Sequence, residues 1–424
     1  MKLAFWLFLC AAPLVLAQDV SPLTLAEAEA IAVKNHPQVS AALLNAAAAN
    51  QVTTEARSAY FPTVFGSVTG AGALTGSRLA AGALNNPIIY NRLAAGITVS
   101  QLITDFGRTS NLTESSRLRA QAQAQTAQAT QADVLLQVNH AYFTALRAQT
   151  VLRVAQETVA ARQLVTDQVT ELANSKLKSG LDVSFASVNL SEAKLLLANA
   201  RSDVQAAFSE LSTALGYRDQ RVFRLSDPAE PGPLPPDSAK LIRDGIQARP
   251  ELAGSRSERD AALKFASAEK ALSYPTVSAL ASAGGLPAYE DPLRGRYAAA
   301  GVNINVPVFN GHLFSARHSE AELRAQAAAQ NLRDLENRVA RDIQIAWLNA
   351  STAFERLALT AQLLEQASLA MDLAQSRYDL GLSSIVELSQ AQLNKTSAEI
   401  ASASAKYDYQ LLRAVLEYQA GALR

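Results

Sequence analysis

Two stretches of the 424-residue sequence lack any residue that would interrupt a helix, and they limit the possible folds more than any other feature. Neither proline nor glycine occurs in Arg108–Ser179 or in Leu313–Leu380. An α-helix rises about 1.5 Å per residue, so each stretch of roughly 70 residues would extend about 105 Å. Gly-Leu pairs follow in "KSGL" (Lys178–Leu181) and "DLGL" (Asp379–Leu382), where glycine predicts the end of the helix and a return helix after it. The sequence therefore predicts two long helical hairpins.

These hairpins belong to two copies of one larger unit. The motif "YFPTV" around Pro62 returns as "SYPTV" around Pro275, and Gly216 has a counterpart 205 residues later in Gly421. Two copies of about 200 residues are too long for a solenoid period. The sequence therefore predicts a duplicated domain.

Each copy predicts the same order of elements: a helix, two strands and a long hairpin. Proline ends the first helix at Pro62 and Pro275, because it lacks an amide donor and pushes the residue before it toward extended geometry. Alternating apolar and polar residues then predict two strands on either side of a Gly/Pro/Asn-rich loop, at 74–89 and 284–296. The predicted bounds are residues 18–225 for the first copy, with strands at about 62–73 and 90–101 and a hairpin at 108–216; a Pro-rich linker at 226–239; and residues 240–424 for the second copy, with strands at about 275–283 and 297–307 and a hairpin at 312–420.

The N-terminal segment predicts export from the cytoplasm. Residues 1–17, "MKLAFWLFLCAAPLVLA", have Lys2, an apolar stretch and small residues before a polar sequence, which is typical of a signal peptide. The only cysteine is Cys10, and Leu9 before it disfavours lipidation, which prefers a small residue at that place. Without it the mature chain would have no thiol for a disulfide or a thiolate metal site.

Charge and hydropathy indicate how the chain could meet a membrane. The 38 basic and 38 acidic residues balance, which argues against a nucleic-acid partner. After the signal peptide there is no run of 18 apolar residues, so any membrane-crossing segments must be β-strands. Four strands cannot close, and an open edge in hydrocarbon is very costly, so several chains would have to pool their strands.

The order of these features resembles the TolC-like outer membrane efflux proteins, over essentially the whole mature chain. The residues that carry the resemblance are the paired "HP" and "RP" helix starts, the two Pro-Thr-Val hinges, "QLITDFGR" and "VPVFNGH" after the second strands, and "RYDLGLSSIVELSQAQ" (Arg377–Gln392). The resemblance implies a mainly α fold with membrane β, in which a homotrimer forms a twelve-stranded β-barrel that continues into a twelve-helix periplasmic α-barrel.

The same resemblance implies a function and partners. The chain would be the outer membrane channel of a tripartite export system in a Gram-negative bacterium, surrounded by outer membrane lipid and with most of its mass in the periplasm. It would bind a periplasmic adaptor protein and receive substrates from an inner-membrane pump of the RND, ABC or MFS class. No motif selects the exported substrate: drugs, metal ions, polysaccharide precursors and proteins stay open.

The resemblance also implies site residues. In the family a tyrosine, an arginine and two acidic residues close the periplasmic aperture, and the matching positions here are Tyr378, Ser383, Glu387 and Gln390. Ser383 and Gln390 depart from the family pattern. For Glu387 a helix-capping role with Ser384 stays open, and for Tyr378 ordinary packing does. The implied adaptor-contact tips are Gly180, Leu181, Gly381 and Leu382, and the helix-to-strand hinges are Pro62 and Pro275.

Catalytic chemistry is not indicated. The sequence has no phosphate-binding glycine loop, nucleophile elbow or metal-ligand spacing, and its closest histidines, His312 and His318, are poorly spaced for shared ligation on a helix. We therefore expect no enzyme activity and no cofactor. Two alternatives without catalysis stay open, a periplasmic coiled-coil scaffold and a surface-assembly protein without channel activity.

Overall fold

The computed structural model describes residues 22–77, 88–229, 232–291 and 293–423. The chain divides into two compact units, and neither coincides with one copy of the sequence repeat. We name them the hairpin unit and the sheet unit. The hairpin unit consists of Met1–His36, Gln137–Pro233 and Ala353–Leu411, and the sheet unit of Pro37–Leu136, Leu234–Thr352 and Leu412–Arg424. Each unit therefore combines segments of both copies. The predicted signal peptide lies outside the described residues.

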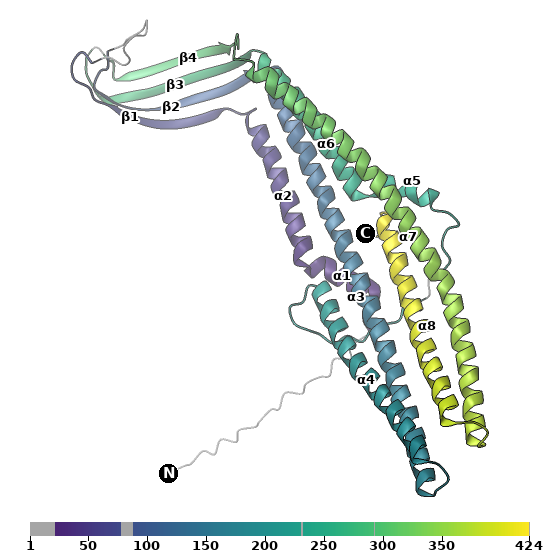
Figure 1. Cartoon of the computed structure of the whole chain (residues 1–424). Helices are drawn as coiled ribbons and strands as arrows, with labels where there is room; N and C mark the ends of the chain where they lie inside the picture. The colour runs from purple at the N-terminus through teal and green to yellow at the C-terminus, as the bar shows by residue number, and fades with distance from the viewer. Residues whose placement is uncertain (1–21, 78–87, 230–231, 292, 424) are drawn as a thin grey trace, which may run out of the picture. The chain divides into compact units, whose positions relative to one another are not determined.

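The sheet unit contains a four-stranded antiparallel sheet, in which the strands lie side by side in sequence order (Figure 1). Each copy of the repeat contributes one hairpin, and the pairing of β2 with β3 joins the copies. The strands are β1 (Thr63–Ala71), β2 (Arg92–Thr104), β3 (Thr276–Tyr289) and β4 (Arg296–Asn305).

One predicted loop is shorter than the sequence suggested. Residues from Gly284 onward were predicted as loop, but β3 continues to Tyr289. Gly284 and Gly285 pair with Tyr297 and Arg296, and the Leu286 amide donates to the Gly295 carbonyl. Backbone pairing on both sides thus holds glycines that the composition alone would assign to a turn. Of the other predicted loop, 74–89, residues 78–87 lie outside the described residues.

The same unit also contains helices. They are α2 (Pro37–Ser58), α5 (Ala239–Ala248), α6 (Pro250–Lys270) with the 3₁₀ turn η1 (Ala271–Ser273), and the N-terminal parts of α3 (Arg108–Asn174) and α7 (Leu313–Asp379). The core between α6, α7 and the end of α8 is built from large aliphatic side chains, which are Leu252, Leu332, Val339, Ile343 and Leu416.

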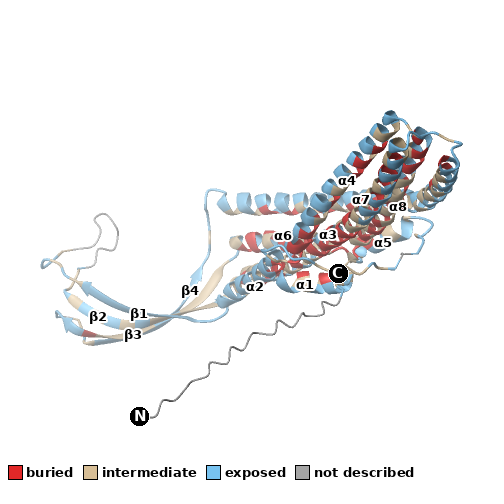
Figure 2. Cartoon of the chain, turned by 90° about the horizontal axis from the view of Figure 1, so that it is seen from below, coloured by how far each residue is buried: buried red, intermediate tan, exposed pale blue. Residues whose placement is uncertain are grey.

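The hairpin unit is entirely helical in its ordered elements. Beside α1 (Leu25–Asn35) it contains the C-terminal parts of α3 and α7 and their return helices, α4 (Gly180–Ala214) and most of α8 (Ile385–Gln419). Alanine is the commonest residue at its buried positions, and its small side chain lets helix backbones approach closely. Buried residues run along these helices, whereas the strands are mainly exposed or intermediate (Figure 2). The most buried alanines of this unit are Ala28, Ala32, Ala145, Ala155, Ala186, Ala193, Ala200, Ala398 and Ala405.

Gly216 and Gly421, which hold equivalent positions in the two copies, follow the ends of the return helices α4 and α8. Gly216 and Gly421 both have positive φ, +80° and +72°, which disfavours a side chain. A β-carbon on Gly216 would lie 2.8 Å from the Asn35 carbonyl oxygen, and one on Gly421 would lie 3.2 Å from the Arg249 amide nitrogen. Each glycine therefore packs on the backbone just before the "HP" or "RP" helix start, within its own unit.

None of the helices in the described ranges combines the length and the apolar character that crossing a bilayer requires.

Candidate functional site: helical tips and sheet faces

The first tip, between α3 and α4, is built differently from the predicted glycine stop. Helix α3 ends at Asn174, and Lys176, with φ of +61°, takes the left-handed conformation expected of glycine. Gly180 is instead the first residue of α4. Ser179 caps that helix: its hydroxyl accepts from the Asp182 amide at 3.2 Å, and Asp182 accepts from the Ser179 amide at 2.9 Å. The hydrogen bonds that the Asp182 carboxylate accepts, first from the Ser179 amide and then from the Ser179 hydroxyl at 2.8 Å, lower the pKa of Asp182.

At the second tip, between α7 and α8, glycine does end the helix. Gly381 has φ of +74°, its amide donates to the Tyr378 carbonyl at 3.0 Å, and the Leu382 amide donates to the Arg377 carbonyl at 2.8 Å. This is a helix end closed by a left-handed glycine. Leu382 at this tip and Leu181 at the other are 66% and 65% exposed, so both tips present a bare leucine.

Tyr378 lies inside the hairpin unit. It is 7% exposed and packs with residues of all four long helices, among them Val169, Ala186 and Leu388. The Lys178 ammonium lies 4.5 Å from the ring centroid, a cation–π contact between the two tips. The Tyr378 hydroxyl has no hydrogen-bond partner among the described residues, and burial is the main cause that raises the pKa of Tyr378. Within one chain Tyr378 is therefore a packing residue.

Hydrogen bonds and ion pairs of the other three aperture candidates, as far as the structure describes them, go to different residues rather than to one another. The Glu387 carboxylate lies 3.2 Å from Arg377 Nε, and both side chains are about half exposed. The Glu387 amide is within 3.4 Å of Ser384 Oγ, so only half of the predicted capping box forms. Gln390 is exposed and donates to Asn394 on its own helix, whereas the Ser383 hydroxyl is buried without a partner among the described residues. Sequence reasoning missed Arg377, although it directly precedes Tyr378 in the motif.

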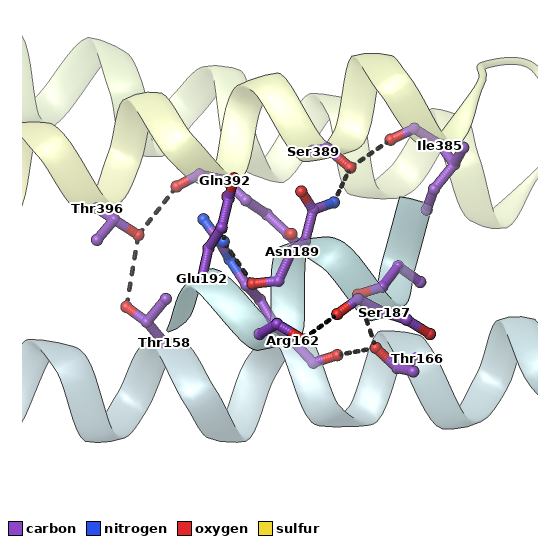
Figure 3. Close-up of polar contacts among 12 residues, drawn as sticks. Thr158, Arg162, Thr166, Ser187, Asn189, Glu192, Ile385, Ser389, Gln392 and Thr396 are labelled. Atoms are coloured by element: carbon purple, nitrogen blue, oxygen red, sulfur yellow. Dashed lines mark hydrogen bonds and ion pairs between the residues drawn. The ribbon is translucent and has the colours of Figure 1, made fainter. Parts of the chain in front are cut away.

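Behind the tips, polar side chains join the α3/α4 hairpin to α8 (Figure 3). The Asn189 amide donates to Ser389 Oγ at 2.6 Å, and Thr158 and Thr396 hydroxyls lie 3.4 Å apart. Arg162 is 6% exposed and donates to the Asn189 carbonyl at 2.7 Å. Burial lowers the pKa of Arg162, and the carboxylate of Glu192, 3.6 Å away, opposes that shift. Thr158, Asn189, Ser389 and Thr396 form a polar seam that no sequence motif announced.

The strand register divides the sheet into two chemically distinct faces. Residues directly opposite each other share a face, so the pairs of β1 through β4 assign the residues of the regular ladders between the register shifts of β2 and β3. One face is rich in hydroxyls and amides: Thr63, Ser67, Thr98, Ser100, Ser278, Ser282, Asn303 and Asn305. The other is apolar and exposed: Val64, Val68, Leu93, Ile97, Val302 and Ile304. An exposed apolar face of this kind suits hydrocarbon rather than water.

Both outer edges of the sheet are unpaired. Strand β1 pairs only with β2, and β4 pairs only with β3, within the part of the chain that the structure describes. Each hinge proline stands at the start of one β-hairpin of the sheet: Pro62 directly precedes β1 and Pro275 directly precedes β3. Proline fits there because it lacks the amide that a ladder position needs.

The described residues contain no group of three or more His, Cys, Asp or Glu side chains arranged to hold a metal ion.

Comparisons with known proteins agree with this geometry. Residues 30–217 and 241–421 match the family model described as outer membrane efflux protein. The chain is 26% identical to the outer membrane protein TolC of Vibrio cholerae, over 96% of this chain and 93% of that protein. Two solved structures share the fold. The CmeC outer membrane channel of Campylobacter jejuni has a TM-score of 0.79 at 17% identity, and the alignment covers 94% of this chain and 85% of the CmeC chain. The open state of the MtrE outer membrane channel of Neisseria gonorrhoeae has a TM-score of 0.77 at 20% identity, and the alignment covers 94% of this chain and 89% of the MtrE chain.

The chain, with its four-stranded sheet and two long helical hairpins, thus has the fold of these two outer membrane channels. The chain belongs to the outer membrane efflux protein family. The predicted family, the function as an outer membrane export channel and the location in a Gram-negative outer membrane are thereby confirmed.

Proposed function

We propose that three copies of this chain close a twelve-stranded β-barrel in the outer membrane and pool their hairpins into a twelve-helix periplasmic tunnel. The observation that carries the proposal is the sheet: among the described residues it has two unpaired edges and one apolar, exposed face. Unpaired backbone groups in hydrocarbon each cost several kcal/mol, about the net stability of a small domain. Pairing β4 of one copy with β1 of the next removes both edges, and the family resemblance selects three copies rather than two.

In this assembly the chain is the outer component of a tripartite export system. Its partners are a periplasmic adaptor and an inner-membrane pump of the RND, ABC or MFS class. The exposed leucines of the two tips, Leu181 and Leu382, with Gly180 and Gly381 beside them, offer the adaptor a small apolar contact at each hairpin end. The channel conducts and does not catalyse.

The aperture candidates take the following parts in this proposal. Glu387, exposed near the second tip, supplies a negative charge to the pore, and Arg377 partly neutralises it. Ser383 and Gln390 add no charge. Tyr378 closes the aperture only by packing, because its ring is held in the hairpin unit.

In this proposal the segments of the chain have the bounds that the sequence predicts. Residues 1–17 are the signal peptide, 18–225 and 240–424 are the two copies, and 226–239 are the linker between them. Pro62 and Pro275 mark the level at which periplasmic helices become membrane strands.

The test is the mass of the purified protein in detergent, measured by native mass spectrometry, together with its gel mobility before and after heating. A trimer whose mobility changes on heating is expected, because a closed barrel resists unfolding by detergent until it is heated. A stable monomer would rule out the assembly.

A further inference from the structure

One row of the sheet pairs a large side chain with two glycines. Ser67, Gly96, Gly284 and Tyr297 lie directly opposite one another across β1, β2, β3 and β4. Because directly paired residues share a face, all four belong to the polar face. The row therefore places a tyrosine at one edge strand and no side chain on the two central strands.

The phenol of Tyr297 fills the space that the glycines leave. A β-carbon on Gly96 would lie 2.2 Å from Tyr297 Oη, and one on Gly284 would lie 2.5 Å from Oη and 2.6 Å from Cζ. Real β-carbons essentially never come closer than 3.0 Å to another heavy atom, so an alanine at Gly96 would displace the ring, its closest neighbour. At Gly284 the β-carbon would also lie 2.4 Å from the Ala95 carbonyl oxygen, so an alanine there would displace the backbone as well as the ring. Tyr297 is 38% exposed, and its ring thus lies along the sheet rather than standing away from it.

The backbone conformation does not require glycine at Gly96 or Gly284. Neither Gly96 nor Gly284 has positive φ, and strand interiors normally avoid glycine because it weakens them. Gly301, on the same polar face of β4, has no atom within 4 Å of a built β-carbon. The close contact is therefore particular to the two glycines under Tyr297.

We propose that Gly96 and Gly284 form a seat that holds Tyr297 flat against the channel wall, and that the seated ring keeps the lumen of the sheet region wide. The inference rests on the proposed function, in which the polar face lines the lumen of the three-copy barrel. Three seated rings leave the lumen wide, whereas three displaced rings would extend into it.

The first experiment tests which way position 297 faces. The sequence has a single cysteine, Cys10, in the predicted signal peptide, so Tyr297→Cys introduces a unique thiol into the mature chain. In planar bilayers, a positively charged methanethiosulfonate reagent should lower the conductance of Tyr297→Cys. Val302→Cys is the matched control, since Val302 is 64% exposed on the apolar face of the same strand. Its conductance should not change. An unmodified conductance for Tyr297→Cys, or a block of Val302→Cys, would overturn the proposal.

The second experiment tests the seat. Gly96→Ala should lower conductance by roughly half, because three displaced rings narrow a water-filled lumen. Gly301→Ala should conduct like the wild type. The double variant Gly96→Ala/Tyr297→Ala should recover at least wild-type conductance. Since the added methyl group also approaches the Ala283 carbonyl at 2.7 Å, the deciding comparison is between the single and the double variant, which both carry that contact.

If Gly96→Ala assembles poorly, the yield of assembled protein becomes the readout. We then expect a higher yield for the double variant Gly96→Ala/Tyr297→Ala than for Gly96→Ala. Equal behaviour of the single and double variants, in assembly or in conductance, contradicts the seat. A wild-type protein that forms no channel would contradict the proposed function, whereas a wild-type channel that is indifferent to position 297 contradicts only this inference.

Discussion

Single aromatic side chains fasten the irregular segments of the chain to its long helices. Tyr142 is fully buried, and its one hydroxyl proton is shared between two acceptors, the carbonyls of Leu23 and Ser226, which lie 2.8 and 2.6 Å from the hydroxyl oxygen. These carbonyls flank the isolated bridge between Leu23 and Leu225, so one tyrosine holds the start of the first copy and its end together. Its counterpart in the second copy, Trp347, donates from Nε1 to the Pro235 carbonyl at 3.0 Å in the sheet unit.

The burial of Tyr142 predicts a dependence of stability on alkaline pH. Burial raises its pKa to about 12, compared with about 10 in an unfolded chain. The folded state therefore keeps a proton that the unfolded state releases, and the corresponding stability is present below pH 10 and is lost as the pH rises from about 10 to 12. Denaturant unfolding between pH 9 and about pH 11.5 should show a steeper loss for the wild type than for Tyr142→Phe.

Tyr60→Phe provides the control for this measurement, because Tyr60 is 48% exposed. Its stability should follow the wild-type curve. A Tyr142→Phe curve parallel to that of the wild type would show that Tyr142 does not carry the dependence.

Residue identity predicted the candidate site only in part. The family motif located Tyr378 and Glu387 near the second tip, and in the structure both residues lie there, at the end of α7 and the start of α8. It could not predict that Arg377 would neutralise Glu387 or that Lys178 would lie over the Tyr378 ring, since both contacts depend on how neighbouring helices are rotated. Exposure and contact partners of a helical residue follow from packing, and one sequence does not contain that information.

At the scale of elements, the two tips differ in how the return helix begins. Ser179 and Asp182 form a complete capping box on α4, whereas on α8 only the Glu387 amide approaches Ser384, at the longer distance of 3.4 Å. The difference arises because the Glu387 carboxylate pairs with Arg377, while the Asp182 carboxylate is free to return to the cap.

This asymmetry predicts unequal effects of removing the two caps. Ser179→Ala should lower the local stability of the first turn of α4 by about 1 kcal/mol, and Ser384→Ala should cost α8 roughly half of that. Hydrogen exchange of the amides in each first turn measures both values in the assembled protein. Equal losses at the two tips would show that the hydrogen bonds of the box add nothing beyond the N-cap itself.

At the scale of the whole molecule, the charge at the second tip should influence which ions the channel passes. In the proposed trimer three copies of Glu387 surround the periplasmic opening, and rings of carboxylates favour cations. Glu387→Gln should therefore lower cation preference in reversal-potential recordings. Its stability should change by less than about 1 kcal/mol, because the ion pair with Arg377 is exposed.

Arg377→Gln is the matched variant, since it removes the opposite charge from the same pair. It should raise cation preference. Reversal potentials that do not change in either variant would place the pair away from the ion path.

The sequence by itself determined the elements and their order. Long runs without proline or glycine yield long helices, alternation yields strands, and Pro62 and Pro275 end the helices before them, because these are local effects of backbone geometry and side-chain periodicity. The predicted duplication follows from the same local comparison of residues.

Only the tertiary structure decided which residues meet. It ended α3 at Asn174 on a left-handed Lys176 rather than at Gly180, because the capping box of Ser179 begins α4 there. It continued β3 beyond Gly284, and it seated Tyr297 on glycines that are far apart in sequence. Such outcomes depend on contacts between distant segments, whose free energies compete with local preference and exceed it where pairing or packing is dense.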